Sequence, residues 1–161
     1  MTEPRRIAPE DLKALEEILV LLHVCFAYMD GRIDPPSSLH ALTVSDLVKQ
    51  AENGEVWAVG SPIVACVFLT EKTDCLYLGK LAVHGAERGN GLARKLVSLA
   101  ENRARDMGKS YLELQTRIEL VENHATFAKL GFTRTATGKH PGFDRVTECT
   151  MRKRVTSSVD S

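Results

Sequence analysis

The residues "ERGNGLA" (87–93) join two stretches whose apolar residues repeat with different periods. Before them, "CLYLGKLAVH" (75–84) is an apolar and aromatic run that predicts a strand. After them, apolar or small side chains recur at helical spacing up to 107, and Gly108 is a natural C-terminal stop. The predicted face of this helix consists of Leu92, Leu96, Leu99 or Ala100, and Arg103 or Ala104. A strand, a glycine-rich turn and a helix are therefore expected in direct succession.

Upstream of this unit, the sequence predicts one short strand and two helices. The strand covers 5–8, and a helix opens at "PED" (9–11) and continues to about Tyr28, with Leu12, Leu15, Leu19, Leu22 and Phe26 as its apolar stripe. Turn residues then fill a loop at 30–38. A second, short helix is predicted from its cap and its buried side: Ser45 or Thr43 as the cap, and Leu47 and Val48 inside.

The remaining segments complete a sheet. Strands are predicted at 55–60 and 62–70 around a Gly60-Ser61-Pro62 turn, and at 110–118, 132–137 and 146–153. A short helix at 122–130, closed by Gly131, separates two of them. This order predicts an α/β fold (α+β by some schemes), with one mixed, mostly antiparallel sheet and helices on both faces.

Length and composition favour one ordinary globular domain. We expect a single domain over residues 1–155 and a disordered tail at 156–161. Basic and acidic residues number 21 each, so no overall charge favours nucleic acid. The most apolar stretch (18–29) is too short to span a membrane, which needs about 20 residues. A cytoplasmic protein is expected, with four scattered cysteines as small buried thiols and no metal site.

The glycine-rich turn predicts an anion site. Gly89 and Gly91 directly precede a helix whose first N–H groups have no internal partner, so the backbone there can approach a phosphate closely. Arg88 adds a positive charge. A plain strand-to-helix turn remains the alternative. A P-loop is excluded because Gly-Lys-Ser/Thr is missing, and the dinucleotide fingerprint is excluded because Arg94 replaces its third glycine.

Two motifs give a resemblance to a known family. "LAVHGAERGNGLARKLVSLAE" (81–101) resembles the coenzyme A-binding segment of the GNAT superfamily of N-acetyltransferases, because Arg88, Gly91 and Ala93 match Arg/Gln-x-x-Gly-x-Gly/Ala. "ENHATFAKLGF" (122–132) resembles the later motif of the family, whereas Gly85 replaces its usual proline. The resemblance covers nearly the whole chain and implies a sheet splayed at its fourth and fifth strands.

The resemblance implies acetyl-CoA as the cosubstrate. Backbone N–H groups would cradle its pyrophosphate along one short segment: Arg88, Gly89, Asn90, Gly91, Leu92 and Ala93. The pantetheine arm would lie against the fourth strand, at Leu81, Ala82 and Val83. Asn123 and Phe127 would meet the coenzyme from the opposite side.

The implied reaction is direct attack of an amine on the thioester. The oxyanion would be held by the backbone N–H of Ala82 or Val83. Many relatives protonate the leaving thiolate with a tyrosine, but that position is Phe127 in this chain. Some relatives carry a glutamate base on the fourth strand, at the position of Tyr77, and no acid occurs between Asp74 and Glu87.

Two loops carry candidate acceptor residues. His140 and Asp144 lie at 138–145, where relatives often build an acceptor wall, and His140 is a candidate catalytic residue. Tyr28 and Asp30 follow the first helix and are candidates for substrate binding. For each of these loops, a plain surface turn is the alternative.

Two functions are compatible with these residues. The first is an N-acetyltransferase that acts on a primary amine of a small molecule or a protein, as a monomer or homodimer. The second is a non-catalytic acyl-CoA-binding regulatory module, which Phe127 and the missing acid keep open. The sequence does not identify the acceptor.

Overall fold

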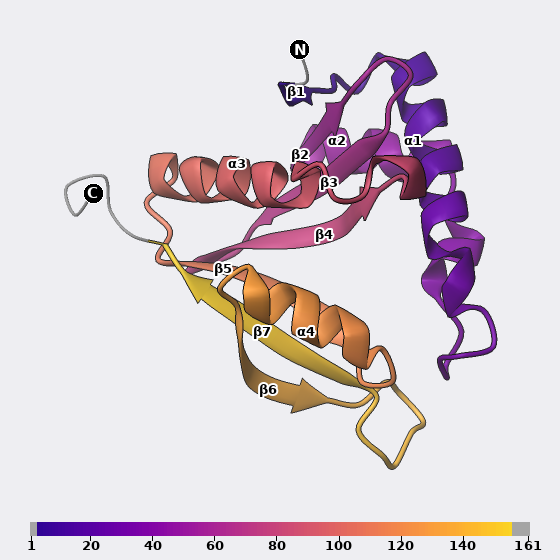
Figure 1. Ribbon diagram of the computed structural model, residues 1–161, viewed down its shortest axis with the longest axis vertical. Coiled ribbons are helices and arrows are strands. Elements are labelled where there is room, and N and C mark those ends of the chain that lie inside the picture. Colours follow the sequence, from indigo (N-terminus) through magenta and orange to yellow (C-terminus); the bar gives the residue numbers. More distant parts are fainter. Residues whose placement is uncertain (1–2, 156–161) are drawn as a thin grey trace.

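The computed structural model describes residues 3–155, so the tail predicted at 156–161 lies outside the described residues. Seven strands form one sheet in the order β1-β2-β3-β4-β5-β7-β6 (Figure 1). Their bounds are β1 (Arg5–Arg6), β2 (Glu55–Val59), β3 (Ala65–Glu71), β4 (Cys75–Val83), β5 (Tyr111–Arg117), β6 (Thr133–Gly138) and β7 (Glu148–Arg154). Among these strands, β4 and β5 pair in parallel and all other neighbours pair antiparallel. The predicted mixed, mostly antiparallel sheet is confirmed.

Helices cover both faces of the sheet. Helices α1 (Leu12–Phe26) and α2 (Val44–Asn53) pack on one face, over β2, β3 and β4. Helices α3 (Leu92–Asp106) and α4 (Val121–Lys129) lie on the other face. Three short 3-10 turns complete the order: η1 (Ala27–Met29), η2 (Ser38–Ala41) and η3 (Gly85–Glu87).

Side-chain caps set where the first two helices begin. Asp11 caps α1 by accepting a hydrogen bond from the backbone N–H of Ala14, so the helix starts after the predicted "PED" turn. Thr43, and not Ser45, caps α2, where Thr43 and Asp46 form a reciprocal capping box. Each cap satisfies a backbone N–H that the helix leaves without an internal partner.

Parts of the predicted burial and strand bounds are wrong. Leu12 is 52% exposed, because it lies in the first turn of α1 and the buried face consists of Ala14, Leu15, Ile18, Leu21, Leu22 and Cys25. Val48, by contrast, is partly buried and packs against the core on the predicted side of α2. β3 begins at Ala65 and not at Pro62, since proline has no N–H to donate to a strand ladder and 60–63 form a wider turn.

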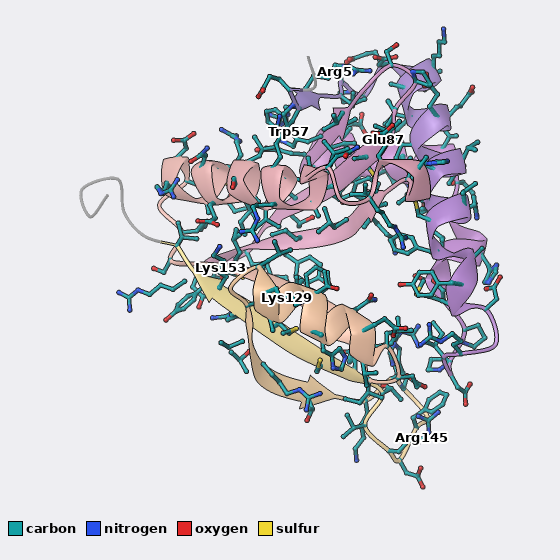
Figure 2. All side chains as sticks on the ribbon, in the orientation of Figure 1. Arg5, Trp57, Glu87, Lys129, Arg145 and Lys153 are labelled. Carbon is teal, nitrogen blue, oxygen red and sulfur yellow. The ribbon has the colours of Figure 1, made fainter. Side chains whose placement is uncertain are left out.

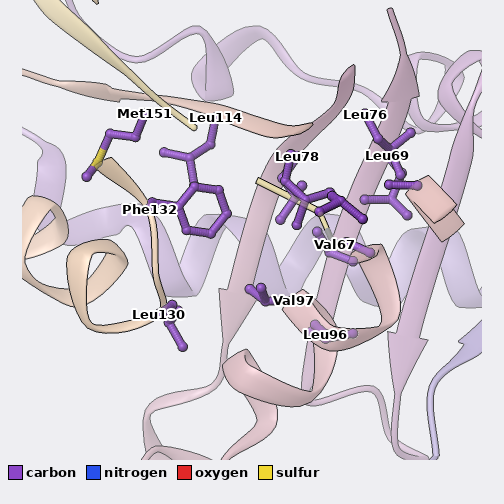
Figure 3. Packing of buried hydrophobic residues seen from close by; sticks show 14 of the residues in the cluster. Val67, Leu69, Leu76, Leu78, Leu96, Val97, Leu114, Leu130, Phe132 and Met151 are labelled. Carbon is purple, nitrogen blue, oxygen red and sulfur yellow. The ribbon is translucent and has the colours of Figure 1, made fainter. Parts of the chain in front are cut away.

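Two apolar clusters lie on the two faces of the sheet. On one face, Leu96 and Val97 of α3 pack against Val67, Leu69, Leu76 and Leu78 (Figure 3). Phe132 and Leu114 extend the same cluster under α4. On the other face, the buried residues of α1 and α2 pack against β2, β3 and β4. The four cysteines are all buried and free, as the sequence predicts.

The sheet opens between β4 and β5. Their pairing ends after three residue pairs, the last being Tyr77 with Glu113. Lys72 and Arg152 both bind the Glu113 carboxylate, with N···O distances of 3.1 and 2.9 Å, and this network holds the paired end together. Beyond Tyr77 the two halves of the sheet diverge, and α1 stands across the open end (Figure 1). The predicted splay at the fourth and fifth strands is confirmed.

A β-bulge reshapes β4 where the splay begins. Phe68 of β3 pairs with Gly79, but Cys66 pairs with Ala82, so two residues of β4 face one residue of β3. Lys80 occupies this bulge with φ of 50°, an uncommon conformation for a residue other than glycine. Function concentrates at such irregular positions, and the cleft described next includes this one.

Candidate functional site

The splay of the sheet opens into a cleft of about 770 Å³. Its walls come from β4, β5, the start of α3, α4 and the segment that follows α1. A cleft of this volume is within the usual range for small-molecule sites. Within residues 3–155, no group of three His, Cys, Asp or Glu side chains could hold a metal ion, and no helix could span a membrane.

The glycine-rich turn leaves the N-terminus of α3 without a side-chain cap. Gly91 is the N-cap residue, and the first i→i−4 hydrogen bond runs from the N–H of Lys95 to the carbonyl of Gly91. The N–H groups of residues 92–94 therefore precede the helical hydrogen bonds and point out of the helix end. Backbone N–H groups and the helix dipole together favour an anion here.

The conformation of this turn requires glycine at two positions. Gly89 and Gly91 have φ of 89° and 78°, in the left-handed region that side chains rarely adopt. A Cβ added at either position would meet no atom within 4 Å. The surroundings therefore leave space for a ligand at both glycines.

Most of the predicted cofactor residues line the cleft: Leu81, Ala82, Val83, Arg88, Ala93, Asn123 and Phe127. Gly89 and Gly91 lie beside it in the turn before α3, where Glu87 is labelled in Figure 2. Asn90 donates a side-chain hydrogen bond to Glu87 within the same turn. The Leu92 side chain is buried in the core, so only its backbone could contact a ligand.

The backbone direction of β4 distinguishes the two predicted oxyanion donors. The N–H of His84 donates to the carbonyl of Val64, so it points toward the β3 side. Successive N–H groups of a strand point to opposite edges. The Val83 N–H therefore faces the open cleft, and the Ala82 N–H faces β3. Of the two predicted donors, Val83 is the better placed.

Phe127 lies in the cleft wall as a half-buried ring. Its edge contacts Phe132, with ring centroids 6.0 Å apart. This aromatic pair fixes the ring against the core, since T-shaped contacts are a favoured geometry. The position offers no hydroxyl to a leaving group.

Polar side chains gather on the cleft wall between β4 and β7. Tyr77 donates a hydrogen bond to the Gln115 amide oxygen at 3.5 Å. Burial raises the pKa of the Tyr77 phenol, and the charges of Glu148 and Glu113 raise it further. Tyr77 is therefore a neutral hydrogen-bond donor near pH 7 and a poor base. Glu148 also lines the cleft, beside His140.

His140 has a fixed ring orientation. Thr147 is fully buried, and its hydroxyl accepts a hydrogen bond from the backbone N–H of His140 while contacting the ring Nδ1. These two contacts to Thr147 hold the imidazole ring in place for either tautomer of His140. The ring Nε2 faces the Glu148 carboxylate at 3.8 Å. His140 is thus held with its Nε2 toward Glu148.

The sequence reasoning missed Glu148. The residue opens β7, far along the chain from the strands that it meets across the cleft. No local motif marks it. Its place in the same cleft as Tyr77 follows only from the sheet order, in which β7 lies next to β5.

The two predicted acceptor loops contribute unequally to the cleft. Tyr28 lines it, and its hydroxyl accepts a hydrogen bond from the Asn123 amide at 3.1 Å, joining η1 and α4 across the opening. Asp30 and Asp144 do not line it: Asp30 pairs with His40 at 2.7 Å, and Asp144 is exposed. Neither aspartate is therefore placed to bind an acceptor in this cleft.

Charged contacts tie the loop after α1 to the other half of the protein. Arg145, labelled in Figure 2, binds the Asp34 carboxylate at 3.2 Å and lies 3.7 Å from Glu119. Arg117 donates hydrogen bonds to the carbonyls of Pro35 and Pro36 at 2.6 and 3.2 Å. These contacts hold the loop over the cleft on the side of α1.

Lys80 projects a charge into this cleft from the β4 bulge. Burial lowers the pKa of its ammonium, and the nearby Arg117 charge lowers it further. Folding therefore disfavours the charged form of Lys80, which costs stability at neutral pH.

This cost predicts a pH-dependent difference in stability. Between the lowered folded pKa and the unfolded value of about 10.4, the unfolded chain binds more protons, so wild-type stability rises with pH relative to a variant without the amine. We expect Lys80→Met to be more stable than wild type at about pH 7 and the gap to narrow toward about pH 10. Urea unfolding of both proteins across this range measures it. If Lys80→Met were less stable than wild type at pH 7 by an amount that does not change with pH, the lowered pKa of Lys80 would be contradicted. Lys49→Met, which removes a lysine on the exposed surface of α2, is the control.

Comparisons with known proteins agree with this geometry. The model of the Acetyltransferase (GNAT) family matches residues 15–132. No curated protein matches the chain. Among solved structures, an acetyltransferase from Streptococcus agalactiae is similar with a TM-score of 0.74 and 17% identity, covering 95% of this chain and 98% of its own.

Two further solved structures have names that specify an acceptor. The ribosomal-protein-S18-alanine N-acetyltransferase from Escherichia coli has a TM-score of 0.66 and 19% identity, covering 98% of this chain and 96% of its own. The IAA acetyltransferase from Bacillus cereus has a TM-score of 0.65 and 18% identity, covering 96% of this chain and 99% of its own. Proteins with such different acceptors are about equally similar to this chain, so the fold alone does not identify its acceptor.

Proposed function

Because the chain belongs to the GNAT family of acetyltransferases, we propose that it transfers the acetyl group of acetyl-CoA to a primary amine by direct attack. The acceptor is a small molecule or a protein amino group. One observation carries the proposal: a single cleft joins the anion-binding end of α3 to a wall that holds the Glu148 carboxylate.

The chain fits acetyl-CoA at three points. The exposed N–H groups at the start of α3 and the Arg88 guanidinium, which lines the cleft, suit the pyrophosphate. Leu81 and Val83, on the unpaired edge of β4, suit the pantetheine arm. The N–H of Val83 is available to the oxyanion that forms when the amine attacks the thioester carbonyl.

The acceptor must lose a proton before it can attack. An alkyl ammonium has a pKa near about 10, so at neutral pH a base is needed. Among the described residues, two carboxylates line the cleft, and Glu122 pairs with Arg32, so Glu148, which lies beside His140, receives this proton in the proposed mechanism. His140 is a positioning residue, because its Nε2 faces Glu148 and its other nitrogen contacts Thr147.

Departure of the thiolate needs less help, and this predicts a small effect at Phe127. A thiol has a pKa of about 8.5, so the thiolate is a fair leaving group without an acid. We expect Phe127→Tyr to change kcat by less than about tenfold, or ~1.4 kcal/mol in the barrier. Steady-state rates at saturating acetyl-CoA measure it. A much larger gain would show that a missing acid limits the enzyme.

Phe127 also favours the second candidate, a non-catalytic acyl-CoA-binding module. The two functions differ in one observable, which is thiol release from acetyl-CoA that depends on an added amine. Steady turnover with any amine excludes a binding-only role. Binding of acetyl-CoA without turnover across a broad amine panel would support it.

A further inference from the structure

The charges on the acceptor side of the cleft include a cation without a counter-ion. Lys80 lines the cleft and is partly buried, and within residues 3–155 it forms no ion pair or hydrogen bond through its ammonium. The charged side chain that acts on it is Arg117, which carries the same sign. Burying an ammonium away from a partner is costly, so its charge is explained best by a ligand.

The described carboxylates in and around the cleft do not pair with Lys80. Glu122 pairs with Arg32 at 2.8 Å, and Glu119 accepts a hydrogen bond from the backbone N–H of Asp34. Glu148 lies on the wall with His140 and is absent from the charges that act on Lys80. Lys80 and Arg117 thus form a positive pocket, and Glu148 supplies a negative charge in the same cleft.

Acetyl-CoA does not provide an anion for this pocket. Its phosphates suit the start of α3, where Arg88 and the free N–H groups lie, and the pantetheine arm carries only uncharged amides. An anion between Lys80 and Arg117 therefore has to come from the acceptor.

We propose that the acceptor is a small molecule that carries a carboxylate in addition to its amine, with the carboxylate held by Lys80 and Arg117 and the amine turned to Glu148. This inference rests on the proposed function. Complementary charges in one cleft orient a zwitterion in one direction, because the reversed arrangement would place like charges together. Lys80 and Arg117 are then residues that determine specificity.

Paired compounds test the inference directly. The common amino acids and their carboxamides differ in the acidic group and in the pKa of the amine, so each pair is assayed for thiol release at saturating acetyl-CoA and compared at equal concentrations of free amine. We expect at least one amino acid to react, with kcat/KM about tenfold or more above that of its carboxamide, since a charge-assisted contact is lost. The difference should lie mainly in KM. A preference expressed only in kcat would indicate that Lys80 stabilises the oxyanion instead, and would overturn the inference.

Variants at Lys80 show whether this residue causes the preference. Lys80→Met should bring the ratio of kcat/KM for acid and carboxamide close to one, and Lys80→Arg should retain most of it. Lys49→Met, on the exposed surface of α2, removes the same charge outside the cleft and should keep the wild-type ratio. Melting temperatures of the wild type with coenzyme A and each compound give a second readout that does not require turnover.

Equal rates for acids and carboxamides would overturn the inference, as would a panel in which no amino acid reacts or raises the melting temperature. A preference for the acid over the carboxamide that persists in Lys80→Met would also overturn the inference. Calorimetry with acetyl-CoA alone distinguishes failure of this inference from failure of the proposed function. If acetyl-CoA binds but the preference is absent, only this inference fails; if acetyl-CoA does not bind, the proposed function fails with it.

Discussion

Replacing Glu148 by glutamine is expected to lower kcat by about 100-fold or more, because general acid–base groups typically contribute about 10²–10⁴-fold. The change keeps the shape of the side chain in the wall beside His140 and removes its ability to accept a proton. Steady-state thiol release at saturating acetyl-CoA and amine measures the loss.

The pH profile makes this prediction specific. Raising the pH supplies free amine without a protein base, so the deficit of Glu148→Gln should shrink toward alkaline pH. Glu52→Gln, a matched change on the exposed surface of α2, should behave as wild type. A loss in Glu148→Gln that is constant with pH, or a loss smaller than about threefold, would contradict the assignment of Glu148 as the base.

Replacing Gly91 by valine is expected to weaken acetyl-CoA binding by about 10- to 100-fold. The added side chain would stand in the open space in front of the N–H groups at the start of α3, where several charge-assisted hydrogen bonds are expected. Isothermal titration calorimetry of the folded variant measures the dissociation constant.

Gly108 provides a matched control for the strain of this substitution. It lies just after α3 with φ of 73°, close to the 78° of Gly91, and a Cβ there also meets no atom within 4 Å. Valine at either position carries a similar backbone cost, about 1–2 kcal/mol or more in the left-handed region. Gly108→Val should lose similar stability yet bind acetyl-CoA normally. Equal binding by both variants would show that the turn does not contact the coenzyme.

The sequence predicts this fold well because its local signals agree with one another. Alternating and helical periods mark each strand and helix, and glycines mark the ends of α3 and α4. The predictions are wrong where a side-chain contact or a single backbone group decides at which residue a helix or strand begins. Asp11 sets the start of α1 through a cap, and Pro62 delays β3 because it lacks an N–H.

Only those site residues that lie within short sequence motifs could be predicted from the sequence. Arg88, the two glycines of the turn and Phe127 lie within short motifs, so the sequence alone is enough to predict them as site residues. Glu148 and Lys80 follow from long-range features that leave no local pattern: the position of β7 beside β5, and a bulge that shifts the register of β4 against β3. The oxyanion donor needed both kinds of information, because the motif gave two adjacent residues and the strand direction favours Val83.

The most direct test of the central claim is thiol release from acetyl-CoA by the purified protein in the presence and absence of an amine panel. Mass spectrometry of the products identifies any acetylated amine. The proposed mechanism predicts amine-dependent release, matched by formation of the acetylated amine and lost in Glu148→Gln near neutral pH. Tight binding of acetyl-CoA with no amine-dependent release at any pH would contradict it.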